Sequence, residues 1–594
     1  MKRRMFIALL ILASFIFLLI GKLLSIQVLA AEHYSSGNIN LLQRSVLQRS
    51  KQLILQDGRG NFYDRSLQPL TGQWRTGLAV LPDQLKLKDS GGRQGELSKI
   101  LRTTPEQWNG FVKRLNRPAF WSESGSAVPY SLGPEQIKRI ESLQIPGVVI
   151  LPVQIRYSGS GAASQLIGFT GQDPKRVAEL YPTLISAGKL SLSSRLGASG
   201  LEKTFDSFLQ GAGPISLAYY TGADDTPLKG LSTRMIGLGN PFYPLKIVTT
   251  LDLSIQEKVE RIMDRYGLQK GAVVVLDAAN ADVIAMASRP AFDPNHVKPQ
   301  DNSWANMALK AITPGSVFKT VITAAALEEG VVKRDETFFC GGELGKYGFS
   351  CWKKGGHGRL GFEEAYAQSC NIVFAKVAER LTAQQLSSYA AKLGITVPVG
   401  WSSDSVISGK SFRQFDSEEE GRLFDERTDS QDEGVIVQTA IGQRDVRITP
   451  LQGANLVVTL LHHGVVFRPR VVKEIRYANG LTKMRFEEQT LRGGKPAVSM
   501  MTARQILSDM ELTVDHGTAQ MLGTAKWNLA GKTGTAQTLD EGRREKVNQW
   551  FTGFGPVESP RYAISVAALN LSPGSGPIVL NIVRDVMNVL AEER

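Results

Sequence analysis

The sequence predicts an α/β protein of the α+β type that carries one N-terminal membrane helix. A long apolar run follows the basic Lys2-Arg3-Arg4 at the N-terminus. A β-branched run from Gly271 to Asp277 precedes a turn and a return strand from Asn280 to Ala287, as in an antiparallel hairpin. Apolar helical segments follow Ser316 and Ser369. We therefore expect the C-terminal half to form a central antiparallel sheet with helices on its faces.

Length and composition indicate a folded protein of several domains. A chain of 594 residues is too long for one ordinary core, and its length suggests two to four domains. From the anchor and the motifs described below, we expect three segments, 1–30, 31–242 and 243–594. The hydrophobic share of 42% and the charged share of 21% exclude collagen-like and disordered classes. The net charge of +13 favours anionic surroundings. Because no basic run interleaved with aromatic residues occurs, we expect a membrane surface or an anionic cell wall, and no nucleic acid, as the partner.

The N-terminal segment predicts a transmembrane anchor. The uncharged run from Met5 to Ile20 is slightly shorter than the ~20 residues that span a membrane, but Lys22 can snorkel, so the span is expected to reach Leu24. Positive charge before the run places the N-terminus in the cytoplasm and the rest of the chain outside. The alternative is a cleaved signal peptide ending at Val28-Leu29-Ala30. We favour the anchor because this site lies far beyond the end of the apolar run.

The cysteines leave two interpretations open. Cys340, Cys351 and Cys370 are the only three in the chain. Outside the membrane, Cys340 and Cys351 could close a short disulfide loop worth at most roughly 3 kcal/mol, or all three could stay free thiols. A zinc site from the cysteines and His357 is only weakly indicated, because the spacing lacks Cys-x-x-Cys. We expect Cys370 to point into the core.

The segment Ile312–Thr320 predicts a nucleophile at the start of a buried helix. Pro314 and Gly315 can shape the first turn, and an apolar core helix follows. Helix positions i and i+3 share a face, so Lys319 would lie beside the hydroxyl of Ser316. A lysine can act as the base for a serine only if burial or a second cation lowers its pKa. Ser-x-x-Lys also arises by chance, so this motif needs partners elsewhere in the chain.

A second polar motif, Ser369-Cys370-Asn371, lies downstream and is expected to open or interrupt a helix. Apolar residues from Ile372 to Ala375 follow it. The hydroxyl of Ser369 could relay a proton, and the amide of Asn371 could hold a substrate carbonyl. The alternative role for this tripeptide is that of a helix cap.

A third motif lies near the C-terminus in Leu529–Ala536. Its small residues are compatible with a strand on which backbone comes close to a ligand. Lys532 and Thr533 could bind a carboxylate. Gly534 removes the side chain that would block the ligand's approach.

These three motifs resemble the penicillin-binding and serine β-lactamase superfamily, in which Ser-x-x-Lys, Ser-x-Asn and Lys-Thr-Gly occur in this order. Further segments look like landmarks of a class B penicillin-binding protein: Asn306-Met307-Ala308, Ile441-Gly442-Gln443, Thr449-Pro450-Leu451-Gln452, Gly517-Thr518-Ala519 and Trp550-Phe551-Thr552-Gly553-Phe554. The chain departs from the family at Arg444-Asp445, where glycine often follows Gly-Gln. The shape of the nearby rim therefore does not follow from the resemblance.

The resemblance extends into the N-terminal half. Asp57–Arg65 resembles the segment that opens the extracytoplasmic part of class B proteins, and Gly200–Asp206 resembles the signature of their pedestal. We expect both segments to shape the fold and to serve partner contacts. For 31–242 the resemblance implies an elongated pedestal of the dimerisation type, mainly β or mixed, and for 243–594 a transpeptidase domain.

Glycan polymerisation is expected to be absent from this chain. The bifunctional class A relatives carry a glycosyltransferase whose motifs combine paired carboxylates with a histidine. Between the anchor and residue 243, this chain has only His33. The resemblance therefore implies a separate, multi-pass membrane polymerase as a partner that pairs with the anchor and the pedestal.

Residues from Trp401 to Asp432 are rich in acidic side chains. We expect a solvated surface insertion here in preference to a binding element, because runs of like charge are usually exposed.

The resemblance implies acyl transfer in two steps, with no metal and no cofactor. Ser316 would attack the carbonyl between the two terminal D-alanines of a peptidoglycan stem peptide, and an amine from a neighbouring stem would release the ester as a cross-link. Lys319, unprotonated beside a cationic Lys532, would be the base. Ser369 would relay the proton, and Asn371 would hold the substrate amide.

The remaining site residues would bind charge. The backbone N–H groups of Ser316 and Thr535 would form the oxyanion hole. Lys532, Thr533 and Thr535 would take the substrate carboxylate beside Gly534, and β-lactam antibiotics would acylate the same serine. Two alternatives remain: transfer to water, as in a β-lactamase or a D,D-carboxypeptidase, and a catalytically silent scaffold for a glycan polymerase.

Overall fold

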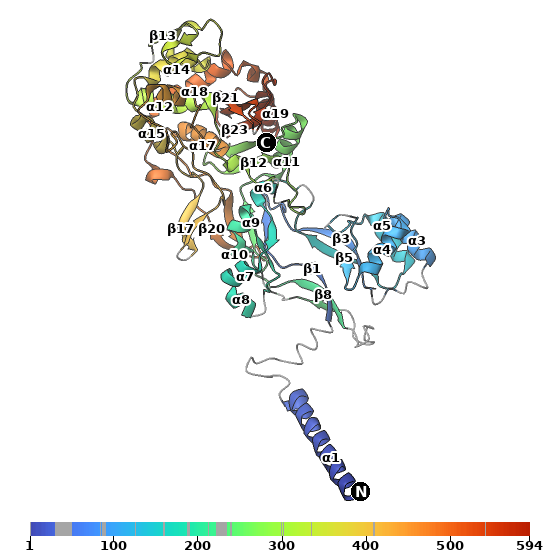
Figure 1. Cartoon of the computed structure of the whole chain (residues 1–594). Coiled ribbons are helices and arrows are strands. Elements are labelled where there is room, and N and C mark those ends of the chain that lie inside the picture. Colours follow the sequence, from blue (N-terminus) through green and yellow to red (C-terminus); the bar gives the residue numbers. More distant parts are fainter. Residues whose placement is uncertain are drawn as a thin grey trace. The chain divides into compact units, whose positions relative to one another are not determined.

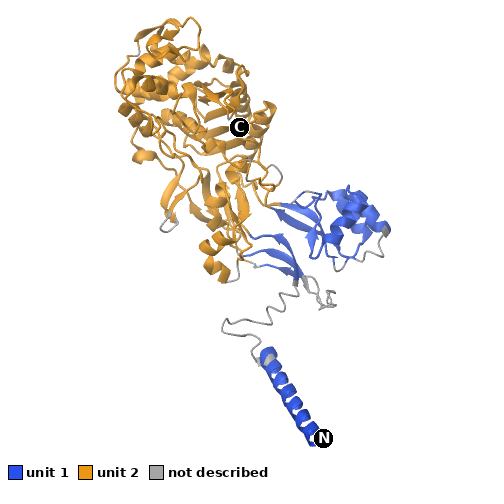
Figure 2. Cartoon of the chain, in the orientation of Figure 1, with its two compact units in different colours: residues 1–58, 74–155, 213–239 blue, residues 59–73, 156–212, 240–594 orange. Residues whose placement is uncertain are grey.

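The structure, a computed structural model, describes most of the chain, namely residues 2–29, 50–82, 85, 91–124, 126, 128–158, 161–186, 190–211, 213–220, 234–237, 240–298, 300, 302–333, 335–407, 410–540 and 542–593. It divides into two compact units (Figure 2). Unit 1 holds 1–58, 74–155 and 213–239, and unit 2 holds 59–73, 156–212 and 240–594. His33 and Ala30, on which two of the expectations depend, lie outside the described residues.

The N-terminal helix α1 (Lys2–Leu24) has 23 residues and is followed by a π-helical turn, Ser25–Leu29. At 1.5 Å per residue it is ~35 Å long, which exceeds the ~30 Å hydrocarbon core of a membrane. The stretch Arg3–Gln27 is long and apolar enough to cross a membrane. Helix α1 therefore fits a single-pass anchor, and it continues past Lys22 as expected.

Among its described residues, the rest of unit 1 contains two small sheets and three helices. One sheet has the order β1-β8-β9 and the other the order β4-β3-β5. Their strands are β1 (Ser50–Gln56), β8 (Ile215–Tyr220), β9 (Arg234–Ile236), β3 (Gln73–Val80), β4 (Ala119–Phe120) and β5 (Val148–Ile155). The helices α3 (Gly91–Ile100), α4 (Pro105–Arg114) and α5 (Pro134–Leu143) share a core around Trp108 and Trp121. A capping box of Thr104 and Gln107 starts α4.

The N-terminal part of unit 2 mixes short strands and helices. A sheet of order β2-β10-β19-β20 pairs β2 (Asn61–Tyr63) in parallel with β10 (Lys246–Thr249), while β19 (Val472–Arg476) and β20 (Thr482–Arg485) are antiparallel. A second, two-stranded sheet joins β6 (Thr170–Gln172) to β7 (Arg195–Gly197). The helices here are α6 (Ser164–Ile167), α7 (Pro174–Leu180), α8 (Pro182–Ser186), α9 (Gly200–Thr204) and α10 (Asp206–Leu209).

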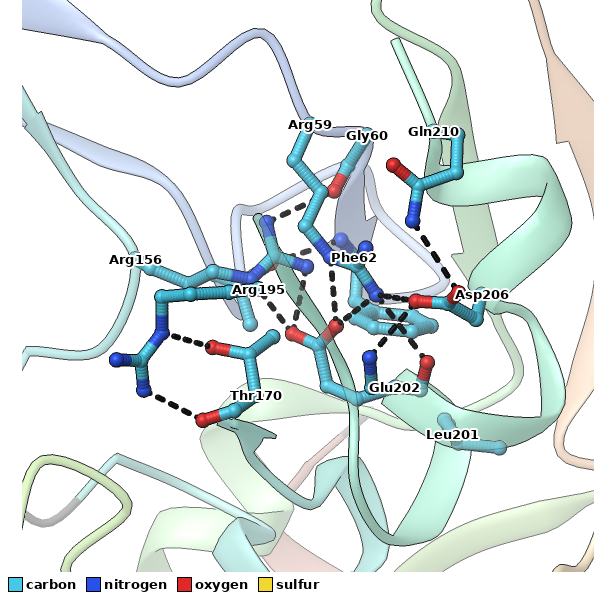
Figure 3. A network of polar contacts seen from close by, with 12 residues as sticks. Arg59, Gly60, Phe62, Arg156, Thr170, Arg195, Leu201, Glu202, Asp206 and Gln210 are labelled. Atoms are coloured by element: carbon cyan, nitrogen blue, oxygen red, sulfur yellow. Dashed lines mark hydrogen bonds and ion pairs between the residues drawn. The ribbon is translucent and has the colours of Figure 1, made fainter. Parts of the chain in front are cut away.

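A buried ion network joins the two segments that resemble the pedestal signature (Figure 3). Arg59 donates to Oε2 of Glu202 at 3.0 and 2.8 Å and to Oδ1 of Asp206 at 2.8 Å. Arg156 donates to the other carboxylate oxygen of Glu202 at 2.6 Å. The Glu202 side chain is 0% exposed, so its charge depends on these cations. The network supports the shaping role that we expected for both segments.

The C-terminal part of unit 2 is built on a five-stranded antiparallel sheet of order β12-β11-β23-β22-β21. The strands are β11 (Gly271–Asp277), β12 (Val283–Arg289), β21 (Ala530–Leu539), β22 (Glu545–Gly555) and β23 (Tyr562–Leu571). The predicted hairpin is therefore confirmed and forms one side of this sheet. Strand β21, which carries the Lys-Thr-Gly motif, is the opposite edge strand.

Helices cover both faces of this sheet (Figure 1). Along β11, Ala272 and Val274 belong to one core cluster, and Val273 and Val275 belong to the other. This double burial explains why the strand is continuously apolar. The helices α11 (Leu253–Arg265) and α19 (Ile578–Glu592) lie on one face, and α12 (Lys319–Glu328), α13 (Phe362–Ala367), α14 (Asn371–Ala378), α17 (Pro450–Leu461) and α18 (Met500–Asp515) contribute to the cluster on the other.

Smaller elements surround this core. The remaining helices are α15 (Ala383–Lys392) and α16 (Glu433–Ala440), with 3-10 turns at Met307–Leu309, Gly315–Phe318, Gly345–Tyr347, Leu491–Gly494 and Gln520–Thr524. Three two-stranded sheets pair β13 (Thr337–Cys340) with β16 (Gly358–Gly361), β14 (Glu343–Leu344) with β15 (Phe349–Ser350), and β17 (Ser402–Ile407) with β18 (Lys410–Arg413).

The acidic segment from Trp401 to Asp432 is only partly the solvated insertion that we predicted. Trp401 is 4% exposed and Phe415 is also buried, so the segment packs on the core. Glu418 accepts backbone N–H groups of Val399 at 2.7 Å and of Gly400 at 3.0 Å. Burial raises the pKa of Glu418 to about 7. The predicted solvated insertion therefore describes many of the acidic side chains but not the whole segment, because the aromatic residues between them pack on the core.

Candidate active site

Ser316 and Lys319 lie on one face of the chain where a 3-10 turn passes into an α-helix. The turn covers Gly315–Phe318, and α12 begins at Lys319. Side chains three residues apart lie on the same side of a 3-10 turn, so this turn places Ser316 and Lys319 on one side, as we expected of an α-helical turn. Ser316 is half-buried, whereas Lys319 is fully buried.

Glycines bring this turn against strand β21, backbone to backbone. Gly315 has a φ of +58°, and a Cβ atom there would lie 2.3 Å from the carbonyl oxygen of Thr535. A Cβ atom on Gly534 would lie 2.3 Å from the carbonyl oxygen of Pro314. Only glycine permits such an approach at both positions. The backbones of Ser316 and Thr535 are thereby held next to each other.

The amine of Lys319 sits among three oxygen atoms of the second motif. Its Nζ atom hydrogen-bonds to the carbonyl oxygen of Ser369 at 2.8 Å, to Oδ1 of Asn371 at 2.8 Å and to Oγ of Ser369 at 3.2 Å. The carbonyl and amide oxygens can only accept, whereas the hydroxyl can also donate. An ammonium group can donate to all three oxygens, and a neutral amine can donate to two of them and accept from the hydroxyl of Ser369. The contacts therefore suit both protonation states of Lys319.

Burial lowers the pKa values of both site lysines. The pKa of Lys319 falls to about 7 because burial removes water from the ammonium group. The pKa of Lys532 falls well below its usual range through burial and through the positive charge of Lys319. The expectation that Lys532 is cationic beside an unprotonated Lys319 therefore stays a prediction. Two buried amines that repel each other cannot both stay charged, so this pair holds a base at neutral pH.

The Ser369-Cys370-Asn371 motif interrupts two helices, as predicted. It follows α13, and Asn371 is the first residue of α14. Ser369 has a φ of +52°, a left-handed conformation that is uncommon for a residue other than glycine. Backbone hydrogen bonds hold it there, from Ser369 to Tyr366 at 3.0 Å and from Cys370 to Ala365 at 2.8 Å. The alternative role as a side-chain cap is not observed, because α14 has no side-chain cap hydrogen bond.

The Lys-Thr-Gly motif lies on the edge strand β21 with its outer edge open to the site. Lys532 is fully buried, Thr533 is half-buried and Thr535 is exposed. The hydroxyls of Thr533 and Thr518 are 2.5 Å apart. Thr518 belongs to the segment Gly517-Thr518-Ala519 that resembles the family, and no role was predicted for it. Its contact with Thr533 makes it part of the site.

One cleft of about 880 Å³ brings the predicted residues together. It is lined by Ser316, Ser369, Asn371, Thr533, Gly534 and Thr535. The two lysines are buried behind this lining and reach it through hydrogen bonds, Lys319 to Ser369 and Lys532 to the carbonyl oxygen of Thr533 at 3.2 Å. Trp352 and Gln549 also line the cleft, and no sequence motif identified them.

The cysteines lie beside this cleft as free thiols. Cys340, Cys351 and Cys370 form no disulfide, so the second of the two interpretations holds. Together with His357 they form a cluster in which the candidate ligand atoms all lie within 4.8 Å of one another. The sequence spacing gave only a weak indication of this proximity.

Two family descriptions match the chain. The family described as "Penicillin binding protein transpeptidase domain" matches residues 271–588, more than half of the sequence. The family described as "Penicillin-binding Protein dimerisation domain" matches residues 55–217. The second match covers the segments joined by the buried ion network.

Similar proteins span most of the chain. Stage V sporulation protein D of Bacillus subtilis is 28% identical over 90% of this chain and 79% of its own length. The peptidoglycan D,D-transpeptidase MrdA of Escherichia coli is 24% identical over 96% of this chain and 91% of its own. A solved complex of penicillin-binding protein PBP2 with MreC from Helicobacter pylori shares the fold, with a TM-score of 0.59 at 22% identity over 92% of this chain and 99% of that one. The chain therefore belongs to the penicillin-binding protein transpeptidase family and is a class B penicillin-binding protein.

Proposed function

We infer that this protein cross-links peptidoglycan stem peptides as a serine-type D,D-transpeptidase. The observation that carries the proposal is the buried Lys319 amine, which contacts Ser369 and Asn371 behind the cleft that Ser316 lines. Relatives that span most of the chain are named peptidoglycan D,D-transpeptidases. The three motifs supply a nucleophile, a base and a site for a carboxylate in one place.

In the first step, Oγ of Ser316 bonds to the carbonyl carbon between the two terminal D-alanines. The hydroxyl proton passes to the neutral amine of Lys319, which lies one 3-10 turn further along the chain. The backbone N–H groups of Ser316 and Thr535 stabilise the negative oxygen, because the glycine contacts hold these two backbones together. The bond to the last D-alanine then breaks, and its nitrogen takes the proton through the hydroxyl of Ser369.

In the second step, the amine of a neighbouring stem peptide attacks the ester on Ser316. Lys319 takes a proton from that amine through Ser369, the ester bond breaks, and the proton returns to the Ser316 oxygen. Asn371 holds the substrate amide during both steps. The enzyme is restored, and one peptide cross-link has replaced one terminal D-alanine.

The substrate carboxylate restores the positive charge of Lys532. In the free site, burial and Lys319 lower the pKa of Lys532. A carboxylate bound by Thr533 and Thr535 beside Gly534 stabilises the ammonium form, because an opposite charge nearby favours ionisation. Lys532 is then cationic while Lys319 stays neutral. The stem peptide itself extends along the open edge of β21, as peptides do when they add a strand to a sheet.

The same site accounts for inhibition by β-lactam antibiotics, which acylate Ser316 as the stem peptide does. The protein is anchored in the cell membrane by α1, with the N-terminus in the cytoplasm and the catalytic part outside. In this proposal the anchor covers residues 1–30, the N-terminal domain covers 31–242 and the transpeptidase domain covers 243–594. A separate, multi-pass glycan polymerase supplies the strands and binds the anchor and the N-terminal domain.

Mass spectrometry of the penicillin-treated protein tests this function. We expect one penicillin adduct on the peptide that contains Ser316, a lifetime of many minutes, and no adduct in the Ser316→Ala variant. An adduct elsewhere would remove Ser316 from its role. Rapid loss of the adduct would favour a β-lactamase. Release of D-alanine without cross-links from pentapeptide substrate would favour a carboxypeptidase, and growth supported by Ser316→Ala would favour the silent scaffold.

A further inference from the structure

An aromatic side chain lies against the amine of Lys532 inside the protein. The Nζ atom of Lys532 lies over the ring of Tyr366, 5.5 Å from the ring centroid. Both residues are 0% exposed. The only hydrogen-bond partner of this Nζ atom among the described residues is the carbonyl oxygen of Thr533, at 3.2 Å. The ring face is therefore the second electron-rich group at this buried amine.

The ring of Tyr366 suits the charged form of Lys532. The face of a tyrosine ring attracts a cation within ~6 Å of the ring centroid, because the π-electrons make that face negative. The attraction is stronger where water is excluded from both groups. A buried ammonium group with a single hydrogen-bond acceptor is otherwise poorly stabilised. The ring therefore compensates part of the cost of burying a charge at Lys532.

Tyr366 is itself fixed by contacts with the other two motif segments. Its hydroxyl group lies 2.8 Å from Oγ1 of Thr320, the last residue of the segment that carries Ser316. The backbone N–H of Ser369 donates to its carbonyl oxygen at 3.0 Å. Burial and the negative charge of Asp509 raise the pKa of Tyr366, so the phenol stays neutral. One side chain thereby joins the segments of all three motifs.

We propose that Tyr366 is a positioning residue that holds the ammonium group of Lys532 for the substrate carboxylate. The inference rests on the proposed function, in which Lys532 becomes cationic when a carboxylate binds. Tyr366 is fully buried and does not belong to the cleft lining, so it acts on the substrate through Lys532. A lysine amine sits on a flexible four-carbon stem, and the ring face gives this amine a fixed place.

The proposal predicts a loss that is specific to ligands with a carboxylate. Benzylpenicillin and its methyl ester separate the two cases, because the ester lacks the negative charge. The second-order rate constants of acylation by each compound are measured by mass spectrometry of the intact full-length protein in detergent. The ratio of the acid's rate constant to the ester's reports what the carboxylate contributes, and it cancels losses that affect both compounds alike.

Two substitutions of Tyr366 give the expected results. Tyr366→Leu removes the ring and should lower the acid-to-ester ratio by about tenfold or more. Tyr366→Phe keeps the ring and loses only the hydroxyl group, so it should change the ratio by less than about threefold. A ratio near one in the wild-type protein, or an unchanged ratio in Tyr366→Leu, would overturn the proposal.

Phe362→Leu is the matched control. Phe362 lies on α13 one turn before Tyr366, is also 0% exposed, and packs on Phe374 with ring centroids 5.6 Å apart. The substitution should destabilise the fold about as much as Tyr366→Leu does, because both remove a buried ring. It should leave the acid-to-ester ratio unchanged. An equal fall of the ratio in both variants would mean that general packing is the cause, and would overturn the proposal.

Fluorinated phenylalanines at position 366 provide a test that does not require the leucine variant to fold. Fluorine withdraws electrons from the ring face and weakens its attraction for a cation, while the shape of the ring changes little. The acid-to-ester ratio should fall with each further fluorine atom. An unchanged ratio with a trifluorinated ring would overturn the proposal and leave the proposed function intact. Failure of benzylpenicillin to acylate the wild-type protein would contradict the proposed function and, with it, this inference.

Discussion

The Nζ atom of Lys319 lies 2.8 Å from Oδ1 of Asn371, which fixes the amine behind the cleft. The same amine contacts both oxygen atoms of Ser369. The protonation state of the Lys319 amine therefore decides whether it can accept the proton of Ser316.

The rate of acylation should rise with pH through neutrality. Burial lowers the pKa of Lys319 to about 7, so the amine is protonated and inactive below that pH and free to act as a base above it. We expect the second-order rate constant for penicillin labelling to fall about tenfold per pH unit below pH 7 and to level off above it. Stopped-flow measurement between pH 5.5 and 8.5 gives this profile. A flat profile would exclude Lys319 as the base.

Gly315→Ala should impair both stability and acylation. The new Cβ atom would lie 2.3 Å from the carbonyl oxygen of Thr535, at a φ of +58°. We expect a loss of more than about 2 kcal/mol in unfolding free energy and at least about a hundredfold in labelling rate, because the turn must move away from β21. Gly330→Ala is the matched control, with a φ of +63° and open space around the new atom.

The control should lose only the ~1 kcal/mol cost of placing alanine in a left-handed conformation, with no change in labelling. Denaturant unfolding and penicillin labelling of both variants make the comparison. Equal effects of the two substitutions would mean that backbone contact between the turn and the strand has no special importance.

Glu202→Gln should destabilise the N-terminal part of unit 2. The substitution removes the carboxylate that pairs with Arg59 and Arg156, which leaves Arg156 without its counter-charge and Arg59 with Asp206 alone. Breaking one side of a buried ion pair typically costs about 3–5 kcal/mol. Limited proteolysis and thermal unfolding should both show the effect.

A surface pair provides the control for this substitution. Glu257 and Arg261 lie on α11, 3.6 Å apart and largely exposed. Glu257→Gln should change the unfolding free energy by less than about 0.5 kcal/mol. If Glu202→Gln and Glu257→Gln changed the unfolding free energy equally, the buried network would stabilise the fold no more than an exposed ion pair does.

Glu418 should make stability depend on pH. Its folded pKa is raised to about 7 from an ordinary value of 4.5, so the folded state favours the protonated carboxyl group. This contribution is complete below pH 4.5 and is lost as pH rises through about 7, which amounts to at most ~3 kcal/mol. Glu418→Gln should remove this slope. Parallel stability profiles of the wild type and the variant between pH 4.5 and 7.5 would refute the prediction.

Most of the site residues could be predicted from local sequence motifs. Ser316, Ser369 and Thr533 line one cleft. They could be predicted because each belongs to a short motif whose helix or strand was recognisable from its own residues. The hairpin of β11 and β12 was predicted for the same reason. Each depends on residues close together in the chain.

Features that depend on distant residues were harder to foresee. The cluster of Cys340, Cys351, His357 and Cys370 is formed by four segments, and spacing alone says little about such convergence. Glu418 was expected in solvent because its neighbours in sequence are charged, whereas its neighbours in space are backbone N–H groups. The lower pKa of Lys532 likewise results from burial next to Lys319, which a motif does not report.

The direct packing of Gly315 and Gly534 on opposing backbones limits how this enzyme can escape an antibiotic. No side chain lies between the turn at Gly315 and strand β21 at Gly534. Any larger residue at either position would therefore push the turn and the strand apart. Resistance substitutions that preserve growth are therefore expected at other positions of the cleft lining, such as Trp352 and Gln549.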